Sequence, residues 1–553
     1  MSEKLILKNE NIENHNHKNS VKTENKTDNN LFIPILILAI SLYLRLSGIN
    51  FGLPYILEPE ESKNLLTAIS PLKSLFSFNS LETSVLFNFL STLIVLFSSG
   101  TLDINSLTNV IEVNPYSLYF PLRILSTLFA LGSILIVYFI GRSFNKTAGI
   151  ISSGLLSVSF LHVKYSQMFM PFSSLTFCTL LCSYFLVRSV VQEKSNLFFI
   201  IAGISAFLSM TFNVFGIVNL VPILFYLKKT NKVYFHSKVL IGIFLLLLLL
   251  INPSIVLQAF DFIKYFVVNY ITGYYNFPSS SYLLYSYRIP LQGIGPVAYL
   301  SVFFLLFKHE QFSSKALAVL FSFPLMFISV LGLLHISKIG YGTVIVPYFC
   351  ISAGLVLADL FHQKKSEANK LIFIILCIFA FWIPLKYSLR YNKIMGLSDT
   401  RVIATDWISE KASGDVKIIR DKNTIQNNWF YAYDKGRLEK AGIDPDLLVD
   451  RSEFLIDSHL LRKKDWFKIL KKKVDFVIID SIDSEKVLRQ PDSKLMKKYY
   501  LKFSRRKPEI PFNPYLMEYD KKINSSLIED LYSPFETLWQ RERPGPVIKI
   551  YKL

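Results

Sequence analysis

Long apolar runs recur along the chain from residue 31 to residue 388, separated by shorter polar stretches. A helix needs about 20 apolar residues to cross the hydrocarbon core of a bilayer, and shorter runs can cross when they tilt little or pair. The pattern therefore predicts a polytopic α-helical membrane protein with about eleven transmembrane helices. These spans are expected at residues 31–47, 118–140, 147–163, 172–190, 197–211, 213–227, 237–257, 289–307, 316–334, 343–361 and 370–388.

Positive charges between the spans indicate how the chain is oriented. Cytoplasmic loops carry an excess of lysine and arginine, and the basic loops of this chain share one side only if the apolar stretch 84–98 does not cross. We therefore expect 84–98 to be a helix at the outer interface, within the first external loop. The basic residues expected in the cytoplasm are Arg142, Lys146, Arg188, Lys194, Lys228, Lys229, Lys232, Lys238, Lys308, Lys315, Lys364, Lys365 and Lys370.

Both ends of the chain differ from this apolar middle. The first thirty residues are rich in Asn, Lys and Glu, which is typical of a disordered tail and not of a signal peptide. Beyond residue 390 charged residues become dense, with strands expected at Val416–Arg420 and Val474–Asp480 and a helix at Thr400–Lys411. The predicted organisation is a cytoplasmic tail (1–30), a transmembrane domain (31–390) and an extracytoplasmic soluble α/β domain (391–553).

Composition agrees with a membrane protein and narrows the chemistry. The chain is 51% hydrophobic, and its net charge of +19 suggests basic loops and attraction to anionic lipid, with no need for nucleic acid. The four cysteines lie inside apolar segments and have neither zinc spacing nor a disulfide context. No Gly-rich phosphate loop or serine triad is present, which disfavours soluble nucleotide chemistry.

A short acidic run, Glu58-Pro59-Glu60-Glu61, follows the first span after a stretch of turn residues. Carboxylates at this point sit at or near the membrane surface, where an apolar neighbourhood can raise a pKa and create a general base. Glu60 and Glu61 are therefore the candidate catalytic residues, acting on a lipid-linked substrate. The alternative is an ordinary solvated start of a polar loop.

Six further residues are candidates for substrate binding. His162 and Lys164, at the outer end of the third span, could hold a donor phosphate, or could only snorkel to the interface. In the external loops, aromatic rings could stack on sugars or polyprenyl chains, and cations could bind phosphate, although an interfacial aromatic belt explains most of the tyrosines. The loop candidates are Tyr274, Tyr275, Arg288 and Lys338.

The order of several motifs resembles the membrane glycosyltransferases of the C superfold, the group of the protein O-mannosyltransferases and the lipid A aminoarabinose transferase. Members usually carry His-Pro-Asp-Glu where this chain has its acidic run, and a His-Val-Arg-Tyr-Ser string where it has Leu161–Ser166. An Arg-Pro-Asp triplet with a second carboxylate usually follows, whereas this chain has Met170-Pro171-Phe172. Further similar strings are Leu44-Arg45-Leu46, Gly141-Arg142, Asn252-Pro253, Asp399-Thr400-Arg401 and Gly545–Tyr551.

The resemblance implies an inverting glycosyltransferase in the plasma (inner) membrane of a prokaryote. Such an enzyme moves a sugar from a polyprenyl-phosphate donor to a glycan, lipid or protein acceptor on the outer side, with membrane lipids as its surroundings. The family's catalytic Asp aligns with Glu60, which is one methylene longer. The resemblance does not decide whether the enzyme uses a divalent cation as a cofactor. The alternative is a non-catalytic relative that binds a lipid-linked glycan.

Overall fold

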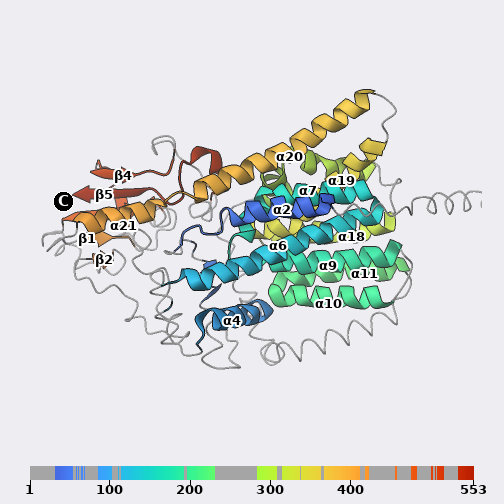
Figure 1. The fold of residues 1–553 in the computed structure, drawn as a ribbon, viewed down its shortest axis with the longest axis horizontal. Coiled ribbons are helices and arrows are strands. Elements are labelled where there is room, and N and C mark those ends of the chain that lie inside the picture. The colour runs from blue at the N-terminus through green and yellow to red at the C-terminus, as the bar shows by residue number, and fades with distance from the viewer. Residues whose placement is uncertain are drawn as a thin grey trace, which may run out of the picture.

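Apolar helices form a bundle that makes up most of the protein, and a small sheet lies at one end of it (Figure 1). The computed structural model describes residues 32–53, 58, 60–61, 64–65, 68, 85–101, 110, 114–191, 196–230, 283–307, 314–334, 336, 338–362, 367–411, 418–421, 455–457, 475–481, 500–501, 503, 505, 507–515 and 534–552. Predicted features outside these ranges include the tail 1–30, the span 237–257, Tyr274 and Tyr275.

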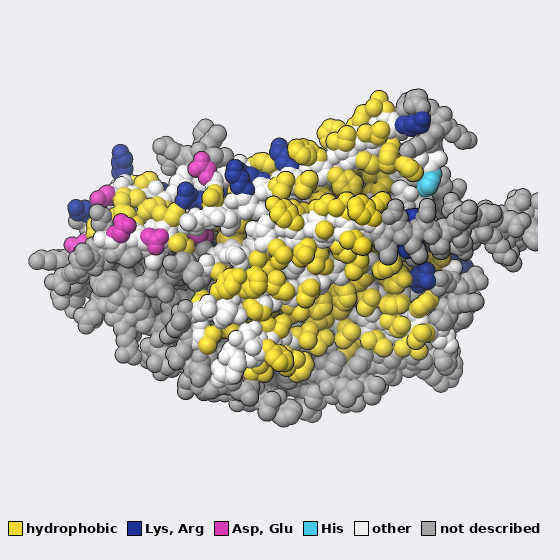
Figure 2. Space-filling model, in the orientation of Figure 1, with side chains coloured by type: hydrophobic (Ala, Val, Ile, Leu, Met, Phe, Trp, Pro, Cys, Tyr) yellow, Lys and Arg dark blue, Asp and Glu magenta, His cyan; other side chains and the backbone are white. Residues whose placement is uncertain are grey.

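The helices of the bundle follow the apolar runs closely. Hydrophobic side chains cover the surface of the bundle, while acidic side chains gather at the end that carries the sheet (Figure 2). The helices are α2 (Phe32–Leu46), α4 (Val85–Ser99), α6 (Tyr116–Phe144), α7 (Lys146–Val158), α8 (Phe160–Ser166), α9 (Phe172–Val191), α10 (Asn196–Phe212), η2 (Val214–Asn219), α11 (Leu220–Thr230), η4 (Leu284–Arg288), α16 (Ile289–Ile294), α17 (Pro296–Phe307), α18 (Ser314–Leu333), η6 (Ile339–Tyr341), α19 (Gly342–His362) and α20 (Glu367–Met395).

Within the described residues, five helical segments are long and apolar enough to cross a membrane, and a bent pair, α7 with α8, adds a sixth if it is one span. The chain is therefore a multi-pass membrane protein. Shorter apolar helices occupy the other described positions where spans were expected, so the total of eleven stays a prediction. The five segments are Tyr116–Phe144, Phe172–Val191, Ser314–Leu333, Ile339–His362 and Lys370–Trp407.

The expected third span, 147–163, is a bent pair and not one straight helix. Helices α7 and α8 meet at 59°. The bend frees backbone carbonyls, which need new donors inside an apolar bundle. Arg45 Nη1 donates to the carbonyl of Ser157 at 3.1 Å, and Ser388 Oγ donates to that of Val158 at 2.8 Å. The expected span 289–307 is likewise broken, at Gly295, whose φ of 86° favours glycine.

The segment that contains α4 begins and ends at the same end of the bundle. Arg123, in the second turn of α6, donates hydrogen bonds to the carbonyls of Ile49 and Phe51, just after α2, at 2.6 and 2.8 Å. Helix α4 packs beside the N-terminal part of α6 (Figure 1). The chain therefore leaves α2 and enters α6 on one side. That return agrees with the expectation that α4 does not cross, which stays a prediction about the membrane.

Among the described residues, the C-terminal sheet has five strands in the order β2-β1-β3-β5-β4. Its parallel half contains β1, β2 and β3, and β5 runs antiparallel to both β3 and β4. Helix α21 (Thr400–Lys411) packs on the sheet through Ala404 and Trp407. The expected helix and both expected strands are confirmed. The strands are β1 (Ile418–Arg420), β2 (Leu455–Asp457), β3 (Phe476–Asp480), β4 (Ile510–Phe512) and β5 (Ile548–Lys552).

Candidate active site

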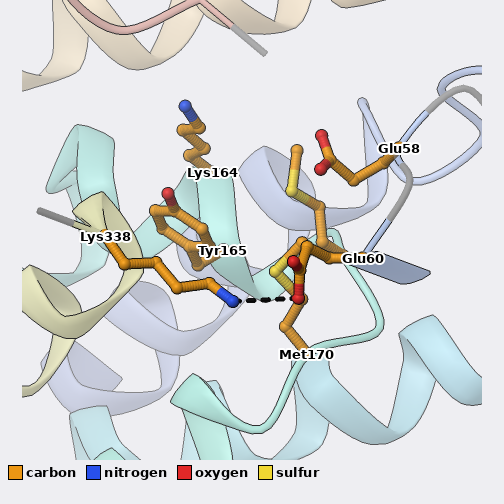
Figure 3. A pocket seen from close by; sticks show the side chains of 7 residues that line it. Glu58, Glu60, Lys164, Tyr165, Met170 and Lys338 are labelled. Atoms are coloured by element: carbon orange, nitrogen blue, oxygen red, sulfur yellow. Dashed lines mark hydrogen bonds and ion pairs between the residues drawn. The ribbon is translucent and has the colours of Figure 1, made fainter. Parts of the chain in front are cut away.

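A pocket lies where three loops meet at the end of the bundle (Figure 3). The first loop follows α2 and the second follows α8. The third lies between α18 and α19. All three belong to segments that the charge pattern places on one side of the membrane, and the structure does bring them together. The lining residues are Glu58, Glu60, Lys164, Tyr165, Met168, Met170 and Lys338.

Glu60 and Lys338 form an ion pair within this pocket. Lys338 Nζ donates to Glu60 Oε2 at 2.9 Å, and both side chains are about one-third exposed. The same ammonium lies 5.6 Å from the centre of the Phe172 ring, close enough for a cation–π contact. Lys338 therefore contacts both the Glu60 carboxylate and the face of the Phe172 ring. A partly exposed pair of this kind can separate when a ligand competes for either charge.

Lys164 lies at another side of the pocket, and its chain extends away from the Glu60–Lys338 pair (Figure 3). The residue is only 1% exposed, yet it lines the pocket. Its ammonium lies 5.4 Å from the centre of the Tyr165 ring and 5.8 Å from that of Phe535. Two aromatic faces thus flank the charge. Burying a lysine ammonium between rings costs free energy unless a counter-charge or a ligand interacts with it.

Glu61 is separated from the pocket although it follows Glu60 directly. It is fully buried and forms a two-pronged ion pair with Arg123, at 2.8 and 2.5 Å. Its Oε1 also accepts a hydrogen bond from the backbone N–H of Phe169 at 2.6 Å. Successive helical residues point about 100° apart, which sends the two acids in different directions. Glu61 therefore ties the loop after α2 to α6 and to the second pocket loop.

His162 is also buried outside the pocket. Its Nδ1 lies 2.6 Å from Arg45 Nη2, and the same guanidinium holds the carbonyl of Ser157 at the bend between α7 and α8. The bend is what carries α8, and with it Lys164 and Tyr165, to the pocket. His162 thus occupies a position in the packing of α2 against α8, away from the lining residues.

Arg288 contacts the C-terminal part of the chain. Its Nη1 lies 3.1 Å from Glu536 Oε1, and its side chain is half exposed. It ends the π-helical turn η4, directly before α16. Arg288 does not line the pocket. Of the eight sequence candidates, the structure brings Glu60, Lys164 and Lys338 together, places Glu61, His162 and Arg288 elsewhere, and does not describe Tyr274 and Tyr275.

Sequence reasoning did not select four of the lining residues. Glu58 belongs to the acidic run but was not a candidate, and the methionines at 168 and 170 gave no signal because apolar residues are common at the end of a span. Tyr165 follows Lys164 in the string Leu161–Ser166, which supports the resemblance. That string was the signal in the sequence that could have identified Tyr165. In the described part of the chain, no three His, Cys, Asp or Glu residues form a group that could hold a metal ion.

Three comparisons place the chain among known proteins. A search of curated proteins finds no match. Among solved structures, ArnT from Cupriavidus metallidurans bound to undecaprenyl phosphate is 12% identical, with a TM-score of 0.49, and the match covers 83% of this chain and 95% of ArnT. The archaeal oligosaccharyltransferase AglB from Archaeoglobus fulgidus, in complex with an inhibitory peptide and a dolichol-phosphate, is also 12% identical, with a TM-score of 0.48 and coverage of 84% and 70%.

The family comparison covers part of the transmembrane region. Residues 109–256 match the model of the dolichyl-phosphate-mannose-protein mannosyltransferase family. This stretch includes α6, α7, α8 and the second pocket loop, and so it contains Lys164 and Tyr165. The match confirms the resemblance of this chain to the membrane glycosyltransferases of the C superfold.

Proposed function

We propose that this protein is an inverting glycosyltransferase that takes a sugar from a polyprenyl-phosphate donor. The observation that carries the proposal is the carboxylate of Glu60 in a pocket lined by two lysines, Lys164 and Lys338. The family match over residues 109–256 supports the class of donor. The acceptor is a hydroxyl of a glycan, a lipid or a protein on the outer side of the plasma membrane of a prokaryote.

Glu60 acts as the general base in this mechanism. Its carboxylate takes the proton of the acceptor hydroxyl while that oxygen forms a bond to the anomeric carbon of the sugar. The bond between the anomeric carbon and the phosphate oxygen breaks, its electron pair stays on the phosphate, and the configuration inverts. One base suffices because a phosphate leaving group needs little protonation.

Lys338 couples donor binding to this base. In the ion pair, the ammonium at 2.9 Å occupies the oxygen that would accept the proton. The negative phosphate of the donor competes for the same ammonium, and charge-assisted hydrogen bonds to phosphate are strong enough to replace a partly exposed pair. When Lys338 turns to the phosphate, Glu60 is released next to the acceptor. Lys164 adds a second positive charge that stabilises the phosphate as it leaves.

The apolar part of the pocket suits the lipid portion of such a donor. Tyr165, Met168 and Met170 supply an aromatic face and two flexible thioether chains. Methionines adapt to irregular apolar ligands, and aromatic faces stack on sugar rings. The triplet Met170-Pro171-Phe172 thus replaces a polar wall by an apolar one beside Lys338.

The decisive experiment begins with the lipid that accompanies the protein. Purified protein is extracted and its bound lipid identified by mass spectrometry, and the corresponding labelled sugar donor is then offered with candidate acceptors. A polyprenyl-phosphate lipid and transfer of label support the proposal. Binding of that lipid without turnover on any donor favours the alternative, a non-catalytic relative that holds a lipid-linked glycan. If neither binding nor turnover occurs, both functions are excluded.

A further inference from the structure

The C-terminal part of the chain reaches Lys164 through the segment 534–543, which follows the helix bundle by more than a hundred residues in sequence. Phe535 in this segment is 1% exposed and stacks on Phe160 of α8, with ring centres 5.6 Å apart and an angle of 10° between the rings. Its neighbour Glu536 pairs with Arg288. The ring of Phe535 is therefore fixed against the same short helix that carries Lys164.

A second set of contacts holds this segment to α20. The Trp539 ring packs edge-on against Tyr387, with Lys386 Nζ 4.7 Å from its centre. The backbone carbonyl of Arg541 accepts a hydrogen bond from Arg390 at 2.6 Å. None of these residues lines the pocket. Docking of the segment and its contact with Lys164 can therefore be tested separately.

Phe535 supplies one of the two aromatic faces that flank the Lys164 ammonium. A lysine side chain has four rotatable bonds, and ordering it when a ligand binds costs about 0.5–1.5 kcal/mol. The negative faces of Tyr165 and Phe535 attract the ammonium and restrict those rotations before any ligand arrives. Tyr165 belongs to the same helix as Lys164, whereas Phe535 comes from the other part of the protein.

We propose that Phe535 is a positioning residue for the phosphate site, because it holds Lys164 at the pocket in the orientation that binds the donor phosphate. The inference rests on the proposed function for the identity of the ligand. It adds that the site is incomplete without the C-terminal segment. The transmembrane part alone would then present a mobile Lys164 and bind polyprenyl phosphate more weakly.

The test uses binding of polyprenyl phosphate to the purified full chain, which needs no turnover. Phe535→Leu keeps an apolar side chain and removes the aromatic face, and we expect the Kd to rise roughly 2- to 12-fold. Trp539→Leu removes a docking contact that does not involve Lys164, and we expect a lower melting temperature with a smaller rise in Kd than Phe535→Leu causes. If transfer is established, Phe535→Leu should raise the KM for the donor and lower kcat/KM.

Two further measurements separate positioning from simple packing. In a Lys164→Met background, Phe535→Leu should cause no additional loss of binding, because the group that it positions is gone. Replacement of Phe535 by pentafluorophenylalanine keeps the ring's shape and its stacking on Phe160 but reverses the charge of its faces. That replacement should weaken binding at least as much as leucine does, and it serves even if the leucine variant fails to fold.

The proposal is overturned if Phe535→Leu and the fluorinated ring leave the Kd unchanged, or if Trp539→Leu raises it equally. An undiminished effect of Phe535→Leu in the Lys164→Met background also overturns it. Failure of the proposed function looks different. In that case the wild-type protein binds no polyprenyl phosphate, whereas failure of the positioning role leaves wild-type binding intact and insensitive to residue 535.

Discussion

Lys338 Nζ lies 2.9 Å from Glu60 Oε2, although 278 residues separate the two in the sequence. The contact joins the loop after α2 to the loop before α19. It places a carboxylate and its counter-charge in the pocket, and the same ammonium lies 5.6 Å from the centre of the Phe172 ring. The pair thus has the two groups that the proposed reaction needs, a base and a cation for phosphate, held in contact before the donor arrives.

Replacing Glu60 by glutamine removes the proposed base and keeps its shape. We expect Glu60→Gln to lower the rate of sugar transfer by about 10²–10⁴, because an amide cannot take the acceptor's proton. Binding of polyprenyl phosphate should change little. The rate is measured as transfer of a labelled sugar by purified protein.

Glu58→Gln is the matched control, since Glu58 lines the same pocket and carries the same charge. It should cost far less than Glu60→Gln. Full activity of Glu60→Gln would remove Glu60 from the chemistry, and equal losses in both variants would assign the effect to pocket charge.

Changes at Lys338 should act mainly on the donor. Lys338→Met removes a charge-assisted contact to phosphate worth about 1.5–3 kcal/mol, so we expect the KM for the donor to rise roughly 10- to 150-fold. Lys338→Arg keeps the charge and should retain much of the binding. The dependence of initial rate on donor concentration measures both. An unchanged KM in Lys338→Met would show that Lys338 serves only to hold Glu60.

The contrast between Glu60 and Glu61 shows where sequence reasoning ends. The acidic run, its place after the first span and the neighbouring apolar residues identify both acids as candidates, but they give the two acids the same surroundings. Only the packing of α6 decides between them, because Arg123 reaches one carboxylate and not the other. The partner is 62 residues away in sequence, and no periodicity links the two.

Most helices and strands were predictable because buried elements carry apolar residues in continuous runs or at regular spacing in the sequence. Apolar runs predicted α6, α9, α18 and α19, and the Val- and Ile-rich run at 474–480 predicted β3. The bend at Ser159 was not predictable in this way. It depends on Arg45 of α2 and Ser388 of α20, whose side chains donate hydrogen bonds to the carbonyls that the bend frees. The contact of Phe535 with Lys164 likewise depends on how the C-terminal segment docks.

Glu61 should be needed for stability more than for chemistry. Glu61→Gln leaves the buried Arg123 guanidinium without its charged partner, which typically costs about 3–5 kcal/mol. We expect the melting temperature of Glu61→Gln in detergent to fall well below that of Glu60→Gln, which changes a partly exposed acid. A thermal unfolding series of the two variants measures this. If Glu61→Gln is as stable as the wild type but inactive, Glu61 belongs to the catalytic group after all.

The sidedness of the pocket can be tested with single cysteines in a cysteine-free background. Asp406→Cys, on the exposed face of α21, reports on the part that carries the sheet, and Ser143→Cys reports on the loop between α6 and α7. The basic residues around Ser143 predict a cytoplasmic position for that loop by the positive-inside rule. We therefore expect a membrane-impermeant maleimide to label Asp406→Cys in intact cells, and Ser143→Cys only after the membrane is opened. The reverse pattern would place the pocket in the cytoplasm, and labelling of both in intact cells would mean that an even number of spans separates the two sites. Labelling as expected would put Glu60, Lys164 and Lys338 on the outer side, because they share their end of the bundle with the junction of α2 and α6.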